Sequence, residues 1–227
     1  MLAYKQFFML KFIPFLVLLA SCSFGPGNFQ SRHSTDLETR SIRRIAVLPP
    51  EQMAVEERAK LPHSSAPSSE GKGGEKEAGT ILSNLLYSTI SALPHWQIVS
   101  DREVKEVLAK VPQARDSSRA RKLGELVYAD AVVSGRVLRF RERVGEEWGV
   151  KSPASVSFVL ELWDVKRGDL IWSGRFDETQ RPLNENLFAI GEFTQRGGRW
   201  LTAEELTLEG VKKAVNQLHQ ILYREAT

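Results

Sequence analysis

Apolar side chains recur at three- and four-residue steps in four stretches of this chain, which is the spacing of one face of an α-helix. The pattern predicts helices over residues 81–93, 101–108, 118–127 and 203–222. The second and fourth of these open with Ser100-Asp101-Arg102-Glu103 and Thr202-Ala203-Glu204-Glu205. Both segments are capping boxes, in which a hydroxyl and a carboxylate satisfy each other's free backbone donors, and they mark where the two helices begin.

A period of two predicts the strands. Apolar and polar side chains alternate over residues 155–162, which is typical of an antiparallel strand buried on one face. Lys166-Arg167-Gly168-Asp169 then reads as a hairpin turn, and the return strand carries Leu170, Trp172 and Phe176 on one face. Residues 131–144 form a third strand, whose arginine-rich end suits an exposed, twisted edge. The three strands together predict an antiparallel meander.

The order of the elements predicts the fold class. Two short apolar runs, residues 43–48 and 96–99, add strands before the meander. The order is therefore strand, helix, strand, two helices, three strands, helix. It predicts an α+β fold: a two-layer α/β sandwich with a mixed sheet of about five strands and about four helices.

The amino terminus carries its own pattern. Residues 1–11 hold two lysines and no acidic residue, and residues 12–20 form an apolar run of nine. Nine residues are too few to span a bilayer as a helix, which takes about 20, but they fit the core of a signal peptide. Leu19-Ala20-Ser21-Cys22 follows and resembles the bacterial lipobox, with the chain's only cysteine at its end. The alternatives are an ordinary secretory leader or a short membrane anchor.

The lipobox resemblance implies a lipidation site at Cys22 and a signal peptide over residues 1–21. In such lipoproteins the cysteine receives a diacylglyceryl group, becomes the first residue after cleavage, and is acylated on its amine. Several acyl chains, palmitate among them, hold a protein stably on a membrane, whereas one chain holds it only marginally. Ser23 stands where an aspartate would resemble an inner-membrane retention signal. We therefore expect the outer membrane, with the domain facing the periplasm.

Composition divides the remaining chain. Residues 22–41 are rich in Gly, Ser and Pro without periodicity and are interpreted as a flexible tether. Residues 42–227 are expected to form a single periplasmic α/β domain, with a mobile loop over the polar residues 51–79. The 227 residues, 42% hydrophobic and 26% charged, suit one globular domain with additional ends.

Charge and cysteine content exclude several classes. The formal net charge is +3, and Lys5 and Lys11 of the leader supply two of these charges, which leaves the mature chain near +1. A nucleic-acid partner, which requires a clustered basic face, is not expected. A single cysteine excludes an intramolecular disulfide and a cysteine-based zinc site.

Known catalytic motifs are absent from the sequence. It contains no G-x-S-x-G, Walker, H-E-x-x-H or C-x-x-C pattern, so we predict a non-enzyme without a cofactor. The four histidines are far apart in the sequence, and no metal site is predicted. His219 is expected to lie beside the apolar stripe of the last helix. The alternative is that His95 and His219 come together and bind a metal ion. Around the hairpin four acidic residues lack the calcium-loop pattern and are interpreted as solvated turn residues: Asp164, Asp169, Asp177 and Glu178.

One loop is the candidate partner surface. Phe193, Arg196, Arg199 and Trp200 combine the aromatic and arginine side chains that anchor protein interfaces. The alternative is that Trp200 covers the end of the sheet.

The layout resembles a known group of domains. Ile45-Ala46-Val47-Leu48-Pro49, Ala131-Val132-Val133-Ser134-Gly135, and Phe158 to Asp164 with Leu170-Ile171-Trp172 resemble the periplasmic domain shared by the curli-secretion lipoprotein CsgG, the penicillin-binding-protein activator LpoB and the TolB amino-terminal domain. The resemblance covers residues 45–223. It implies a non-catalytic, lipid-anchored interaction or assembly module of the cell envelope with an envelope protein partner, and it leaves a homo-oligomer open. The alternatives are a subunit of an oligomeric secretion pore of the curli-channel type and, from a different class, an envelope-polymer hydrolase.

Overall fold

Strands and helices follow one another in an order close to the predicted one. The computed structural model describes residues 28–52, 72–111, 116–146, 149–180, 194 and 196–223. The strands are β1 (Phe29–His33), β2 (Arg44–Val47), β3 (Glu51–Gln52), β4 (Gln97–Ile98), β5 (Ala131–Arg141), β6 (Val144–Glu146), β7 (Gly149–Ser152), β8 (Ser155–Asp164) and β9 (Leu170–Thr179). The helices are a short 3-10 turn, η1 (Leu37–Thr39), and α2 (Lys72–Ser91), α3 (Asp101–Leu108), α4 (Asp116–Leu126) and α6 (Ala203–Leu222).

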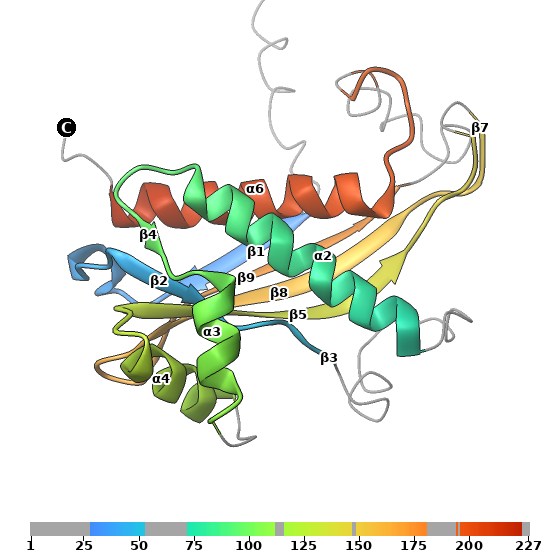
Figure 1. Cartoon of the computed structure of the whole chain (residues 1–227). Coiled ribbons are helices and arrows are strands. Elements are labelled where there is room, and N and C mark those ends of the chain that lie inside the picture. The colour runs from blue at the N-terminus through green and yellow to red at the C-terminus, as the bar shows by residue number, and fades with distance from the viewer. Residues whose placement is uncertain are drawn as a thin grey trace, which may run out of the picture.

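One mixed sheet organises the molecule (Figure 1). Its strands lie in the order β1-β9-β8-β5-β2-β4, and β3 pairs with β5 beside β2. Strands β2 and β3 run parallel to β5, and β4 runs parallel to β2. From β5 onward, through β8 and β9 to β1, each strand is antiparallel to the next. A separate hairpin joins β6 and β7. The predicted α+β class, the antiparallel meander and the four α-helices are confirmed, and the sheet has more strands than the five expected.

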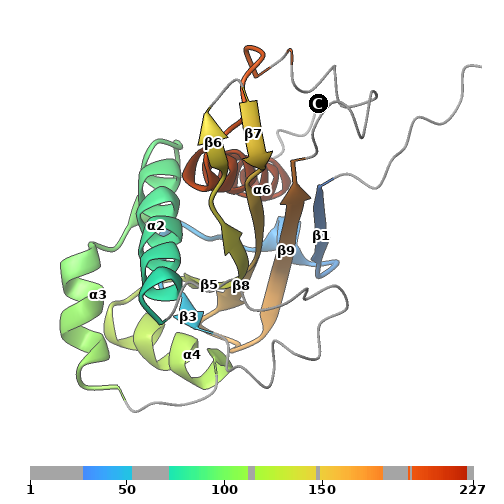
Figure 2. The same ribbon diagram turned by 90° about the vertical axis from the view of Figure 1, so that its right-hand side faces the viewer.

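Helices α2 and α6 pack together on one face of the sheet (Figures 1 and 2). The alternating positions of β8 that the sequence assigns to this face, from Val156 to Leu162, are all buried there. Phe158 and Phe176 stack with ring centroids 5.3 Å apart beneath α6. A Cβ at Gly210 of α6 would come within 2.6 Å of the Phe176 ring, so a glycine allows this close helix–sheet approach.

Helices α3 and α4 lie on the opposite face, over β2 and β5. Neighbouring residues show the two sides: Ile45 belongs to the α2–α6 core, whereas Ala46 belongs to a second apolar cluster with Val104, Leu123 and Val132. The structure thus adds a partial third layer at the β2–β5 end of the sheet. Helix α4 also contacts the end of β8, and the rest of β8 with β9 and β1 has no helix on that face among the described elements.

Two segments depart from the sequence interpretation. The tether was expected to reach residue 41, but β1 pairs with β9 and η1 follows it, so the ordered fold already includes residue 29. The loop was expected over residues 51–79, but Glu51–Gln52 form β3 and α2 begins at Lys72. In both cases pairing or packing with distant residues stabilises a segment whose own composition resembles a loop.

The local signals of the sequence hold in the structure, except that the capping box predicted at Ser100 forms only in half. Thr202 and Glu205 form a complete capping box, and the Ser100 hydroxyl accepts from the Glu103 amide. Gly168 supplies the positive φ of the β8–β9 hairpin, at 75°. Within the described ranges no helix is both long enough and apolar enough to cross a bilayer.

Candidate interaction surface

The predicted partner loop makes intramolecular contacts. The Arg196 guanidinium lies 2.8 Å from the Glu178 carboxylate and 2.6 Å from that of Glu209, and it is largely buried. Arg199 pairs with Glu205 at 2.7 Å. Partial burial acts against the charge of Arg196, but its two carboxylate partners leave the pKa raised.

Trp200 is 9% exposed and so resembles a core side chain more than an interface anchor. Phe193, like Cys22, lies outside the described residues. The ion pairs of Arg196 hold the loop to β9 and α6, and the partner role of the four residues stays a prediction.

The two histidines that the sequence left as an alternative do approach each other. His95 and His219 have ring centroids 6.2 Å apart; His95 stacks with Tyr223, and His219 packs against the same ring at a tilt. The Nε2 atom of His219 lies 3.0 Å from the Pro94 carbonyl oxygen, and His95 adopts a positive φ of 72°. No group of three potential metal ligands occurs in the described part of the chain, so the geometry is that of an aromatic cluster at the carboxyl end of α6.

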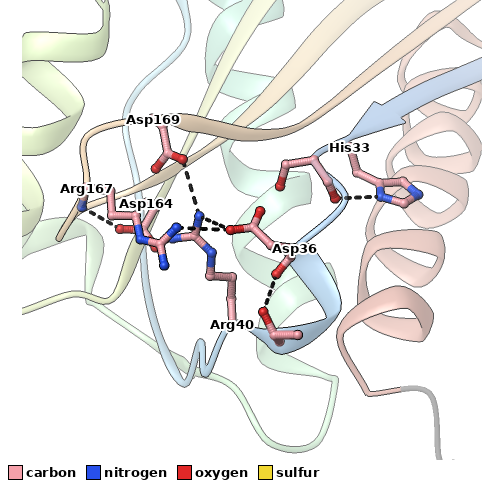
Figure 3. A network of polar contacts seen from close by, with 8 residues as sticks. His33, Asp36, Arg40, Asp164, Arg167 and Asp169 are labelled. Carbon is pink, nitrogen blue, oxygen red and sulfur yellow. Dashed lines mark hydrogen bonds and ion pairs between the residues drawn. The ribbon is translucent and has the colours of Figure 1, made fainter.

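The acidic residues around the hairpin bind arginines rather than water alone (Figure 3). Arg40 lies 2.7 Å from Asp164, 2.7 Å from Asp36 and 3.3 Å from Asp169. Burial alone would lower the pKa of Arg40, but its carboxylate neighbours raise it, so the cation is retained. The network fixes the segment after β1 to the β8–β9 hairpin.

The feature that the sequence missed is an arginine-rich face of the sheet. Register places five arginines on the β1-β9-β8-β5 face away from α2 and α6: Arg32, Arg136, Arg139, Arg141 and Arg175. The same face carries two carboxylates, Glu161 and Asp177. Its alternation was visible in the sequence, but the sequence interpretation assigned the arginines of residues 136–143 to an outer edge. Arg136, Arg139 and Arg141 lie instead on β5, which pairs with β8 as far as Arg141, and Arg143 follows the strand.

Cross-strand rows define the geometry of this face. Arg136, Val159 and Arg175 occupy one row across β5, β8 and β9, with Arg139, Ser157 and Asp177 in the next. Arg139 lies 2.5 Å from Asp177 and 2.6 Å from the Ser155 hydroxyl. Burial alone would raise the pKa of Asp177, but hydrogen bonds from Arg175 and Arg139 lower it overall.

The charges of the face are not balanced internally. Arg32 and Arg141 have no ion-pair partner in the part of the chain that the structure describes. Five cations against two anions make the face complementary to an acidic surface.

Comparisons with known proteins give remote similarities. No protein-family model matches the chain, and no curated protein sequence matches it. Among solved structures, the PelC dodecamer from Paraburkholderia phytofirmans is 15% identical, with a TM-score of 0.41, over 84% of this chain and 96% of that one. Lipoprotein GNA1162 from Neisseria meningitidis is 19% identical, with a TM-score of 0.37, over 68% and 92%. The LpoB C-terminal domain from Salmonella enterica is 17% identical, with a TM-score of 0.36, over 62% and 84%.

Proposed function

We propose that this chain is a lipid-anchored, non-catalytic interaction module of the cell envelope. Acyl chains on Cys22 hold it to the outer membrane, and the domain faces the periplasm. The observation that carries the proposal is the arginine-rich face of β1, β9, β8 and β5, most of which lies beyond α3 and α4 and is not covered by any described helix. An envelope protein with an acidic surface is the partner that such a face fits.

The proposed anchor lies close to β1 along the chain. Only residues 23–28 separate Cys22 from Phe29, the first residue of β1. Six residues span about 20 Å when fully extended. A lipid on Cys22 therefore keeps Phe29, at the start of β1, and with it the arginine-rich face, close to the membrane surface.

Lipid labelling tests the anchor. Labelled palmitate should enter the native chain in growing cells and should not enter the Cys22→Ala variant. That variant should accumulate as an unprocessed precursor, because lipid transfer precedes cleavage in lipoproteins of this pattern. Equal labelling of the two chains would remove the anchor from the proposal.

Crosslinking tests the surface separately. A photoreactive residue at Val159, in the centre of the face, should capture a discrete envelope protein in intact cells, identified by mass spectrometry. The capture should fall when Arg32 and Arg141 are both changed to Glu, since the reversal removes the complementary charge. The matched control is Lys212→Glu, an exposed cation on α6. Capture that is insensitive to Arg32 and Arg141, or equally sensitive to Lys212, would reject this face.

A further inference from the structure

Strand β1 turns half of its backbone groups away from the sheet. The Asp177 amide donates to the Asn28 carbonyl at 2.9 Å, and the Ser34 amide donates to the Ile171 carbonyl at 3.0 Å. Hydrogen-bonded pairs recur every second residue in an antiparallel ladder, so Gln30 and Arg32 also face β9. The backbone groups of the intervening residues, Phe29, Ser31 and His33, consequently point outward.

This outer edge has the features of a pairing site. Within the described ranges β1 pairs with β9 alone, and it forms the edge of the sheet in Figure 2. Its register contains no bulge, and its sequence, Phe-Gln-Ser-Arg-His, contains neither proline nor lysine. A bulge, a proline and a lysine are three of the devices by which proteins block an edge against another strand; of the others, β1 has a short length of five residues and the charged side chain of Arg32.

We propose that the edge of β1 pairs with β1 of a second copy of this chain, antiparallel and centred on Ser31. In that register Ser31 lies opposite Ser31, and Phe29 lies opposite His33. All three outward residues then donate and accept across the interface. The result is an isologous, two-fold contact that continues the sheet from one copy into the next.

Comparison of registers supports a second copy and selects Ser31 as the centre. Centring on Ser31 places Arg32 opposite Gln30, so a cation meets an amide. Centring one residue later would place the two Arg32 side chains directly opposite each other, which is destabilising for like charges in a cross-strand pair. Centring one residue earlier would leave His33 without a partner within the described strand, Phe29–His33. The strand is therefore self-complementary in one register.

The side chains favour the same arrangement. Phe29 already packs against Trp172, with ring centroids 6.4 Å apart, so its position is fixed before pairing. His33, which lies on the α6 side of the strand in Figure 3, is exposed and available to the opposite Phe29. A pre-ordered edge loses little conformational entropy on association.

Cysteine crosslinking of the full chain in cells tests the register. Ser31→Cys should give a disulfide-linked dimer under mild oxidation, because residue 31 faces itself across the two-fold axis. Gln30→Cys should not, since its Cα lies diagonally, about 7–8 Å, from its counterpart, beyond the usual disulfide limit of about 7 Å. The unmodified chain, whose only cysteine is Cys22, and Gln220→Cys on the exposed side of α6 are the controls. Absence of the Ser31→Cys dimer, or equal dimer at Gln30 or Gln220, overturns the proposal.

A proline tests the hydrogen bonds. Ser31→Pro removes an outward amide and leaves every β1–β9 bond intact, so light scattering of the full chain in detergent should show half the wild-type protein mass. Ser31→Ala should keep the wild-type mass, and circular dichroism checks that both variants stay folded. A wild-type chain with the mass of one copy, or a folded Ser31→Pro chain with the mass of two, contradicts the pairing. Neither measurement depends on the arginine-rich face or on its partner.

Discussion

The guanidinium of Arg40 lies 2.7 Å from the carboxylate of Asp164, although 124 residues separate them in the chain. Both side chains are nearly buried, at 8% and 11% exposure. The pair joins the segment that follows β1 to the end of β8, and Asp36 and Asp169 complete it.

Replacement of Arg40 should lower the free energy of unfolding substantially. Arg40→Met leaves the Asp164 carboxylate buried without its cation, and the loss of one partner from a buried pair costs about 3–5 kcal/mol. Urea unfolding of the two chains measures the difference. Arg167→Ala is the control, because Arg167 is 61% exposed and its solvent-screened pair with Asp36 should contribute little to stability. Similar losses for the two variants would contradict the central role of Arg40.

Two neighbours on β8 should respond very differently to truncation. Phe158 is fully buried against α6, so Phe158→Ala should cost about 3–5 kcal/mol through lost burial and a cavity. Ser157 points to the opposite face and is also buried, at 1% exposure, with a hydroxyl that has no partner. Ser157→Ala should therefore be neutral or slightly stabilising, because it removes an unsatisfied polar group. The wet face expected from the alternation is absent here, and a clear loss at Ser157 would show that its hydroxyl is bound.

Two helical glycines provide a test of packing. Gly210→Ala should destabilise the fold by about 1–3 kcal/mol, because the new methyl group would meet the Phe176 and Phe158 rings at 2.6 and 2.9 Å. Gly79→Ala in α2 should instead stabilise it by about 0.5–1 kcal/mol, since the nearest atoms lie 3.7 Å away. Thermal melts of both variants suffice. Stabilisation at Gly210 would mean that α6 can move away from the sheet at little cost.

The capping box of α6 should depend on pH. Hydrogen bonding from Arg199 lowers the pKa of Glu205 from its ordinary value of 4.5, with the Thr202 amide adding to the effect and partial burial opposing it. Its contribution to stability is therefore complete above pH 4.5 and is lost as the pH falls through the lower folded value. Glu205→Gln should be less stable than wild type at pH 7, by under about 1 kcal/mol, and the difference should shrink at pH 3. A difference that grows on acidification would falsify this assignment.

Local sequence patterns predicted most of the helices and the meander, because these elements are determined largely by residues close together in the sequence. The alternation over residues 155–162 and the Thr202 capping box both act at short range. The strand and the capping box form as predicted, although Ser155 and Ser157 on the second face of the strand are buried as well. Strand β1 has no such signal: Phe29 is its only large apolar side chain, and the strand exists because β9 supplies its hydrogen bonds.

The candidate surface shows the same limit. The arginines of β5 are recognisable as exposed positions, but only register brings Arg175 and Arg32 beside them from strands far along the chain. Arg196 and Trp200 show the converse. Their residue types favour an interface, yet Glu178 and Glu209 bind the arginine, and the tryptophan is buried. A sequence motif does not reveal whether its partners lie in the same molecule.

The antiparallel pairing of β1 with β9 also has a mechanical consequence for a chain anchored at Cys22. Tension transmitted through residue 28 along the strand loads the β1–β9 hydrogen bonds in shear, so they must fail together rather than open one after another. Behind them, the ion pairs of Arg40 resist the same pull at the far end of the segment. A pull through the proposed anchor at Cys22 would therefore meet the whole β1–β9 ladder at once.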